Sequence, residues 1–137
     1  LINIPVTLRF IKLIRENTNY KPKFYSLNSN SELISAISND MDYNKIFTYQ
    51  AETYLDKGDL VIFISSSGNS KNVINLLDYC NTKGIDNIAF TGFSGGYLNK
   101  NAKISIHIPA NHYGVSEDCH HILMHVIMQN IIYSLKK

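Results

Sequence analysis

The sequence predicts an α/β fold in which a doubly wound parallel sheet carries helices on both faces, as a three-layer αβα arrangement. Short apolar runs typical of buried strands alternate with amphipathic segments typical of helices. Two loops rich in small residues follow predicted strands, at the carboxyl ends where open α/β sheets bind ligands. The chain has 137 residues, and this length predicts a single domain over residues 1–137 with one core.

The first part of the chain predicts two helices and one short strand. Residues 8–15 have the pattern of the end of a helix, and residues 23–27 are a strand candidate. Ser31 is placed to cap a helix over residues 32–38. The Asn39-Asp40 pair is expected to end that helix, because Asn tolerates the left-handed conformation found at such stops.

The central elements have the clearest pattern. An amphipathic helix is expected over residues 43–55, ended by Gly58. Its apolar side chains are Ile46, Phe47, Tyr49, Tyr54 and Leu55. Residues 59–64 predict the central strand, which is apolar enough to be buried on both faces. A helix over residues 71–82 follows, and Gly84 is well placed to terminate it.

The last part of the chain continues the alternation. Residues 87–90 predict a strand that leads into a glycine-rich loop over residues 91–96. Residues 103–108 predict the final strand. Ser116 is placed to cap a long helix reaching about residue 135, with two acidic residues in its first turn where the helix dipole favours them.

The turn after the central strand is the best candidate for a binding site. Its sequence is Ser-Ser-Ser-Gly-Asn-Ser, and the four hydroxyls belong to Ser65, Ser66, Ser67 and Ser70. Hydroxyl donors, free backbone N–H groups and the positive end of a helix dipole all suit a phosphate group. Ser70 is also expected to cap the following helix. The turn contains no Lys, so it predicts a small phosphorylated metabolite rather than a nucleoside triphosphate.

Composition excludes several other functions. The formal net charge of +2 and the scattered basic residues do not predict nucleic-acid binding. No apolar stretch approaches the ~20 residues of a membrane span, and no signal peptide is recognisable. Cys80 and Cys119 show no metal-binding or redox spacing, so we expect reduced core thiols in a cytoplasmic protein.

The final predicted helix carries a second group of polar residues. Glu117, His121 and His125 recur every four positions and therefore share one broad face. Such a run can hold a metal ion, and a neutral imidazole suits proton transfer near pH 7. The alternative is a polar stripe that faces solvent or a partner subunit.

Taken together, these motifs resemble the SIS (sugar isomerase) domain of the phosphoheptose isomerase type. The matching residues are Gly58-Asp59-Leu60, the run from Ile64 to Val73, Phe90-Thr91-Gly92 with Gly95-Gly96, Asn39-Asp40 before residues 43–47, and Glu117-Asp118-x-His120 with His125. The resemblance covers the chain from about residue 8 onward. It implies a flavodoxin-like fold and an aldose–ketose isomerisation of sedoheptulose 7-phosphate to a heptose 7-phosphate, for surface-glycan heptose synthesis.

The resemblance also implies roles for individual residues. Ser65, Ser67 and Ser70 are expected to hold the substrate phosphate, and His125 to act as a general acid. Glu117 and His125 are the expected ligands of a Zn²⁺ ion. Further substrate contacts are expected from Ser66, Asn69, Asn39 and Asp40, although the last two residues also fit a plain helix stop. The expected assembly is a homotetramer with shared active sites.

One departure from the family pattern leaves a rival function open. Family members carry an upstream strand with a Gly-rich turn, then a helix bearing a His and the Glu base, and we expect these to precede the present chain in a longer protein. If the base is truly absent, the alternative is a non-catalytic SIS module that senses a sugar phosphate, or a tetrameric adaptor that binds another protein.

Overall fold

The computed structural model describes the backbone of residues 4–136 and the side chains of residues 9–136. Residues 1–3 and 137 of the expected domain lie outside the described residues. Three parallel strands form the sheet: β1 (Leu60–Ser65), β2 (Asp86–Thr91) and β3 (Ile104–His107), in the order β1-β2-β3. Ser65 lies opposite Thr91, which lies opposite His107. All three strands therefore end at one edge of the sheet, as predicted for this fold class.

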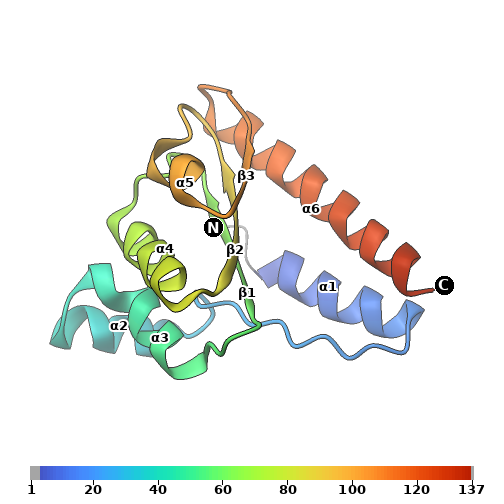
Figure 1. The fold of residues 1–137 in the computed structure, drawn as a ribbon, viewed down its shortest axis with the longest axis horizontal. Helices are drawn as coiled ribbons and strands as arrows, with labels where there is room; N and C mark the ends of the chain where they lie inside the picture. The colour runs from blue at the N-terminus through green and yellow to red at the C-terminus, as the bar shows by residue number, and fades with distance from the viewer. Residues whose placement is uncertain (1–3, 137) are drawn as a thin grey trace.

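Helices cover both faces of the sheet (Figure 1). They are α1 (Ile4–Asn17), α2 (Ser31–Asp40), the 3-10 turn η1 (Tyr43–Lys45), α3 (Ile46–Tyr54), α4 (Lys71–Lys83), α5 (Gly96–Asn101) and α6 (Tyr113–Leu135). Helices α1 and α6 pack together on one face, while α3, α4 and α5 lie on the other. Helix α2 packs beside η1 and α3. The predicted three-layer αβα arrangement is thus confirmed.

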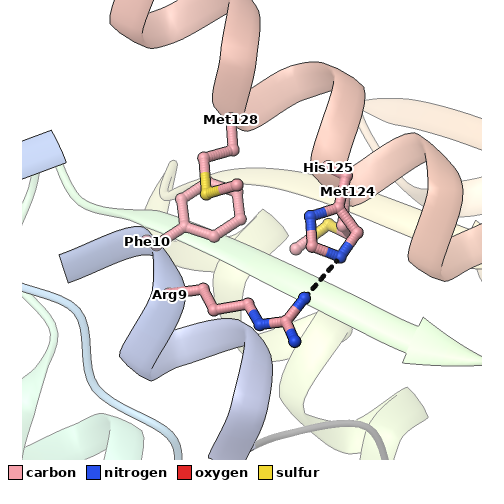
Figure 2. Close-up of a pocket in the computed structure, with 5 residues that line it drawn as sticks. All are labelled: Arg9, Phe10, Met124, His125 and Met128. Carbon is pink, nitrogen blue, oxygen red and sulfur yellow. Dashed lines mark hydrogen bonds between the residues drawn. The ribbon is translucent and has the colours of Figure 1, made fainter. Parts of the chain in front are cut away.

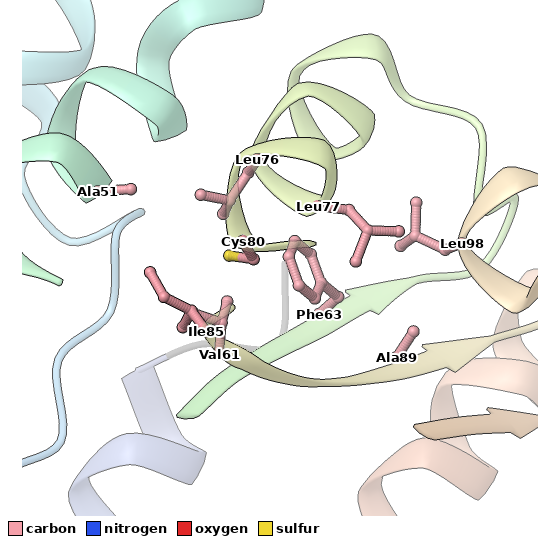
Figure 3. Close-up of a cluster of buried hydrophobic side chains, with 9 residues drawn as sticks. All are labelled: Ala51, Val61, Phe63, Leu76, Leu77, Cys80, Ile85, Ala89 and Leu98. Carbon is pink, nitrogen blue, oxygen red and sulfur yellow. The ribbon is translucent and has the colours of Figure 1, made fainter. Parts of the chain in front are cut away.

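Each face of the sheet has its own apolar core, because successive side chains of a strand point to opposite faces. Val61 and Phe63 of β1 point into the cluster under α4, which Figure 3 shows. Ile62 and Ile64 pack against the other cluster, between the sheet and helices α1 and α6. The buried members of this second cluster are Phe10, Ile14, Phe90, Met124, Met128 and Ile132.

Most predicted elements are confirmed to within a few residues. The three strands of the sheet and the helix that ends at Gly84 lie where the sequence placed them. Gly84 itself adopts φ +68, the left-handed conformation expected at this position. Helix α5 was not predicted, because it spans only six residues and begins inside a glycine-rich loop.

The predicted strand over residues 23–27 is wrong, because this segment is irregular and has no ladder partner among residues 4–136. Its side chains hold it in place instead. The Phe24 ring packs against Phe10, with ring centroids 5.0 Å apart, and the Tyr25 ring packs against Tyr54 at 5.3 Å. The buried Gln50 side chain also donates to the carbonyl of Leu27 at 3.0 Å.

The helix caps near residue 40 differ from the prediction. The side chain of Asn30, not Ser31, caps α2 by accepting from the Leu33 N–H at 2.9 Å. Asn39 and Asp40 lie within the last turn of α2 rather than beyond it. Asp42 caps the 3-10 turn that precedes α3, which divides the single helix predicted over residues 43–55.

Two further expectations about helices need correction. Tyr49 and Tyr54 of α3 are exposed, and Gln50 and Ala51 are buried in their place. Helix α6 begins at Tyr113, capped by the His112 ring, whose Nδ1 accepts from the Val115 N–H at 3.3 Å. The expected cap, Ser116, is therefore a buried residue inside the helix, and no acidic residue lies in the first turn.

Both cysteines are free thiols, as expected; Cys80 is buried and Cys119 is half-buried. Within the described residues, no helix combines the length and the apolar character needed to cross a membrane.

Candidate functional site

A cleft of about 220 Å³ opens at the carboxyl end of β1. It is lined by Ile64, Ser65, Ser66, Ser67, Ser70, Tyr113 and Glu117. Four of these seven residues are the serines that the sequence singled out. The turn between β1 and α4 supplies the serines, and the start of α6 supplies the other polar wall.

The serine turn folds back on itself through its own hydroxyls. The Gly68 N–H donates to the Ser65 carbonyl at 3.1 Å and to the Ser65 hydroxyl at 3.3 Å. The Asn69 N–H donates to the Ser67 hydroxyl at 3.3 Å. A hydroxyl that accepts from the backbone keeps its own O–H to donate, so Ser65 and Ser67 are suited to an anion in the cleft.

Ser70 occupies the cap position of α4, but its side chain makes no capping hydrogen bond. The expected role of its hydroxyl as a helix cap is therefore wrong. The Ser70 carbonyl instead accepts from the N–H groups of Val73 and Ile74, both at 3.0 Å. The hydroxyl lines the cleft, beside the positive end of the α4 dipole.

The glycine-rich loop after β2 supports the serine turn from behind. The Gly92 N–H donates to the Ser66 carbonyl at 2.8 Å, and the Leu98 N–H donates to the Gly68 carbonyl at 3.1 Å. The backbones approach so closely that a Cβ on Gly68 would lie 2.0 Å from the carbonyl oxygen of Gly95. The glycine loop therefore shapes the site through turn geometry rather than through chemistry of its own.

Asn69 was predicted to contact the substrate, but its side chain makes a structural contact. Its Oδ1 accepts from the Tyr97 N–H at 2.9 Å, at the start of α5. Asn69 is not among the residues that line the cleft. Its contact with a substrate stays a prediction, and the structure assigns it the anchoring of α5 against the serine turn.

The second wall of the cleft consists of Tyr113 and Glu117, one turn apart on α6. Glu117 was expected to be a functional residue, and among the described residues that line the cleft it is the only carboxylate. Tyr113 was missed, because the start of α6 was placed at Ser116. Its ring packs edge-on against Phe93, with centroids 4.7 Å apart.

His120 supports the fold rather than the cleft. It is fully buried, and its Nε2 lies 3.0 Å from the Thr91 carbonyl oxygen at the end of β2. Because a carbonyl only accepts, Nε2–H must be the donor. The ring also lies edge-on to Phe90, at 5.9 Å between centroids. His120 thus ties α6 to the sheet.

His125 lies away from the serine cleft, beside a cavity of only about 10 Å³ between α1 and α6 (Figure 2). The other residues that line this cavity are Arg9, Phe10, Met124 and Met128. The Arg9 guanidinium donates to Nε2 of His125 at 3.2 Å. His125 follows Glu117 by eight residues, which places their Cα atoms ~12 Å apart along the helix axis.

The described residues do not form a zinc site by themselves. A structural or catalytic Zn²⁺ takes at least three protein ligands. Within residues 4–136, no group of three or more His, Cys, Asp or Glu side chains is placed to hold a metal ion. The expected ligands Glu117 and His125 line different cavities, and the Nε2 lone pair of His125 is already engaged by Arg9. We therefore derive no chemical step from zinc.

Three other predicted residues lie outside the cleft lining. Asn39 and Asp40 are exposed at the end of α2, so their contacts with a substrate stay predictions. His121 is half-buried on α6 and lines neither the serine cleft nor the cavity at His125.

The SIS domain family matches residues 28–124, a span that contains β1, the serine turn, the glycine loop and the start of α6. The chain belongs to the SIS domain family. It is 38% identical over 106 residues to a phosphoheptose isomerase from Aliarcobacter butzleri, covering 77% of this chain and 56% of that protein. It is also 38% identical over 106 residues to a phosphoheptose isomerase from Chlorobium limicola, covering 75% and 49%.

A solved structure supports the fold of this SIS domain. The phosphoheptose isomerase of Neisseria gonorrhoeae superposes with a TM-score of 0.78 at 24% identity, covering 88% of this chain and 68% of that one. At this identity the likeness concerns the fold alone. The chain spans about half the length of the curated relatives it matches.

Proposed function

We propose that this SIS domain belongs to a sugar-phosphate aldose–ketose isomerase that converts sedoheptulose 7-phosphate to a heptose 7-phosphate. The observation that carries the proposal is the cleft, where four serine side chains meet the amino end of α4. The names of the relatives, phosphoheptose isomerases, support the substrate.

The charges around the cleft orient the ligand. The hydroxyls of Ser65, Ser67 and Ser70 and the dipole of α4 favour a phosphate at the serine end. The carboxylate of Glu117 repels a second anion and accepts hydrogen bonds from hydroxyl groups. The phosphate is therefore anchored by the serines, and the uncharged sugar chain extends along α6.

Anchoring the phosphate fixes the reacting carbons at a set distance from it. Isomerisation moves a proton between C1 and C2 of the sugar, and held geometry is what makes such a transfer fast. The ~12 Å from Glu117 to His125 along α6 is comparable to an extended seven-carbon sugar phosphate. The resemblance assigns the oxygens at C1 and C2 to His125, whose Nδ1 is the ring nitrogen that Arg9 does not engage. It assigns proton abstraction to a carboxylate that the described residues do not supply.

The finer features of the proposal come from the family resemblance. They are a cytoplasmic homotetramer with shared active sites and a role in heptose synthesis for lipopolysaccharide or capsule. Zinc held by Glu117 and His125 stays a prediction of the resemblance alone, because the described residues offer no third ligand.

A second candidate function is non-catalytic recognition of a sugar phosphate, by a sensor module or a tetrameric protein-binding adaptor. The contact between Arg9 and His125 favours it, since the guanidinium occupies the imidazole nitrogen that would otherwise serve the substrate. Such a protein would bind the sugar phosphate in the serine cleft and would not require a residue that abstracts a proton.

The test is turnover of sedoheptulose 7-phosphate by the full-length protein, followed by NMR with and without a chelator. We expect an aldoheptose 7-phosphate to appear. Ser67→Ala should raise KM roughly tenfold or more by removing one hydrogen bond to a charged group. Ser134→Ala, an exposed serine near the end of α6, is the matched control and should leave KM unchanged.

The outcomes separate the two candidates. Binding that depends on Ser67 without any turnover supports the sensor or adaptor and rejects the enzyme. An unchanged KM in Ser67→Ala rejects the assignment of the phosphate site. Absence of both turnover and binding rejects both functions.

A further inference from the structure

The contact between α1 and α6 places a permanent positive charge at His125. The Arg9 Nη1 atom lies 3.2 Å from Nε2 of His125 (Figure 2). Arg9 is exposed and His125 is half-buried, so the pair forms the rim of the small cavity between the helices. Within residues 4–136, no salt bridge joins Arg9 to a carboxylate. Its guanidinium is therefore directed at the imidazole rather than at an acid.

This hydrogen bond determines where the imidazole carries its proton. A guanidinium has five N–H donors and no acceptor, and it stays protonated in proteins. Nε2 of His125 must therefore be the acceptor, and in a neutral ring the proton resides on Nδ1. The Nε2 lone pair, which a metal ion would use, is occupied.

The apolar packing beside the pair keeps Arg9 in this position. Phe10, the next residue of α1, is 3% exposed, and Met124 and Met128 of α6 are 3% and 1% exposed. These three side chains belong to one core cluster, so α1 cannot move from α6 without exposing them. The cavity of about 10 Å³ holds one water at most and has no room for a hydrated cation.

We infer that Arg9 takes the place of a metal ion at His125. It is a positioning residue: it holds the imidazole as the Nδ1–H tautomer, supplies a fixed positive charge beside it, and excludes divalent cations from Nε2. Coordination of a metal ion through Nδ1 is disfavoured as well. It would move the ring proton to Nε2, where the Nε2–H would face the N–H donors of Arg9. Arg9 would have this role in an isomerase or in a sugar-phosphate sensor alike.

The test follows the two ring nitrogens of His125 by NMR in the full chain while Zn²⁺ is added. The variants are Arg9→Met, which keeps an apolar stem but has no donor, and the control Lys12→Ala. Lys12 is an exposed cation of the same helix that pairs with Glu16 at 3.9 Å, so its removal changes the charge of α1 without touching His125. Circular dichroism checks that α1 and the fold persist in each variant.

In the wild type and in Lys12→Ala, we expect the Nδ1–H tautomer and no change at Nε2 with one equivalent of Zn²⁺. In Arg9→Met, we expect the tautomer preference to weaken and the Nε2 signal to shift with Zn²⁺. A zinc-dependent shift of Nε2 in the wild type, equal to that in Arg9→Met, would overturn the inference. A lack of response in both proteins would also overturn it, because exclusion would then not depend on Arg9. Neither readout requires turnover, so a failure here is distinguishable from a failure of the proposed isomerase.

Discussion

Adding one methyl group at Gly68 tests whether the serine turn depends on its close contact with the glycine loop. Gly68 has φ +64, and a Cβ built there would lie 2.0 Å from the carbonyl oxygen of Gly95 and 2.9 Å from its carbon. Both atoms belong to the backbone, so no side chain is available to rotate away. Gly68→Ala must therefore separate the two loops that form the back of the cleft.

Gly84 offers a matched control for the conformational part of the cost. It has φ +68, nearly the same as Gly68, but a Cβ there meets no atom within 4 Å. The left-handed conformation costs an alanine about 1–2 kcal/mol, and the loss of unfolded-state entropy offsets about 0.4–1 kcal/mol of it. We expect Gly84→Ala to lower the free energy of unfolding by about 1 kcal/mol.

Gly68→Ala carries the same conformational cost and a steric cost in addition. Overpacking usually costs about 1–3 kcal/mol, and the backbone contact at Gly95 puts this case at the upper end. We therefore expect a total loss of about 3–4 kcal/mol, which corresponds to a fall in Tm of roughly 10 °C for a chain of this size.

The assay is urea and thermal unfolding of the wild type, Gly68→Ala and Gly84→Ala, with NMR titration of each folded protein by inorganic phosphate. Gly68→Ala should also weaken phosphate binding, because the hydroxyls of Ser65 and Ser67 move with the turn. Gly84→Ala should bind phosphate as the wild type does. Equal destabilisation by the two substitutions, or unaltered phosphate binding in Gly68→Ala, would refute the dependence of the site on this contact.

Two other predictions concern buried groups. His120→Ala should lower the free energy of unfolding by about 3 kcal/mol, because it opens a cavity in the core and removes one of the two donors to the Thr91 carbonyl, which keeps the Ile108 N–H. Urea denaturation measures this loss, and a value under about 1 kcal/mol would contradict the prediction. Burial raises the pKa of the Cys80 thiol from 9.0 to about 11. Iodoacetamide at pH 8 should therefore modify the half-buried Cys119 roughly tenfold faster than the buried Cys80. The stabilisation from the protonated Cys80 thiol is complete below pH 9.0 and is lost as the pH rises through 11.

The sequence was sufficient for the sheet because its signals are local. Each strand is an apolar run bounded by a turn, and Gly84 marks the end of α4 by a conformation that glycine adopts at little cost. The run over residues 23–27 has the same local character but finds no partner strand, and pairing is a property of the whole fold. The prediction of the α2 cap failed for a related reason. Asn30 and Ser31 are adjacent and both are common capping residues, so the sequence alone does not indicate which of them caps the helix.

The site was predictable where it follows from one segment and not where it joins two. Ser65, Ser67 and Ser70, which were predicted to hold a phosphate, line one cleft because all three lie in one turn after a strand; their contact with a phosphate stays a prediction. Tyr113 joins them only because α6 starts three residues before Ser116. Nothing in the sequence indicated the contact between Arg9 and His125, because the two residues are 116 positions apart and meet only through the packing of α1 on α6.

The serine turn and the surroundings of His125 also differ in how well they tolerate substitutions. The part at the serine turn depends on backbone atoms in contact, at Gly68 with Gly95 and at Gly92 with Ser66, so almost any side chain at these two glycines would disturb it. The part around His125 depends on single side chains of two helices, because Arg9 and His125 meet through one hydrogen bond beside the core cluster between α1 and α6. We therefore expect substitutions at Arg9 to change the surroundings of His125 and to leave the serine turn as it is.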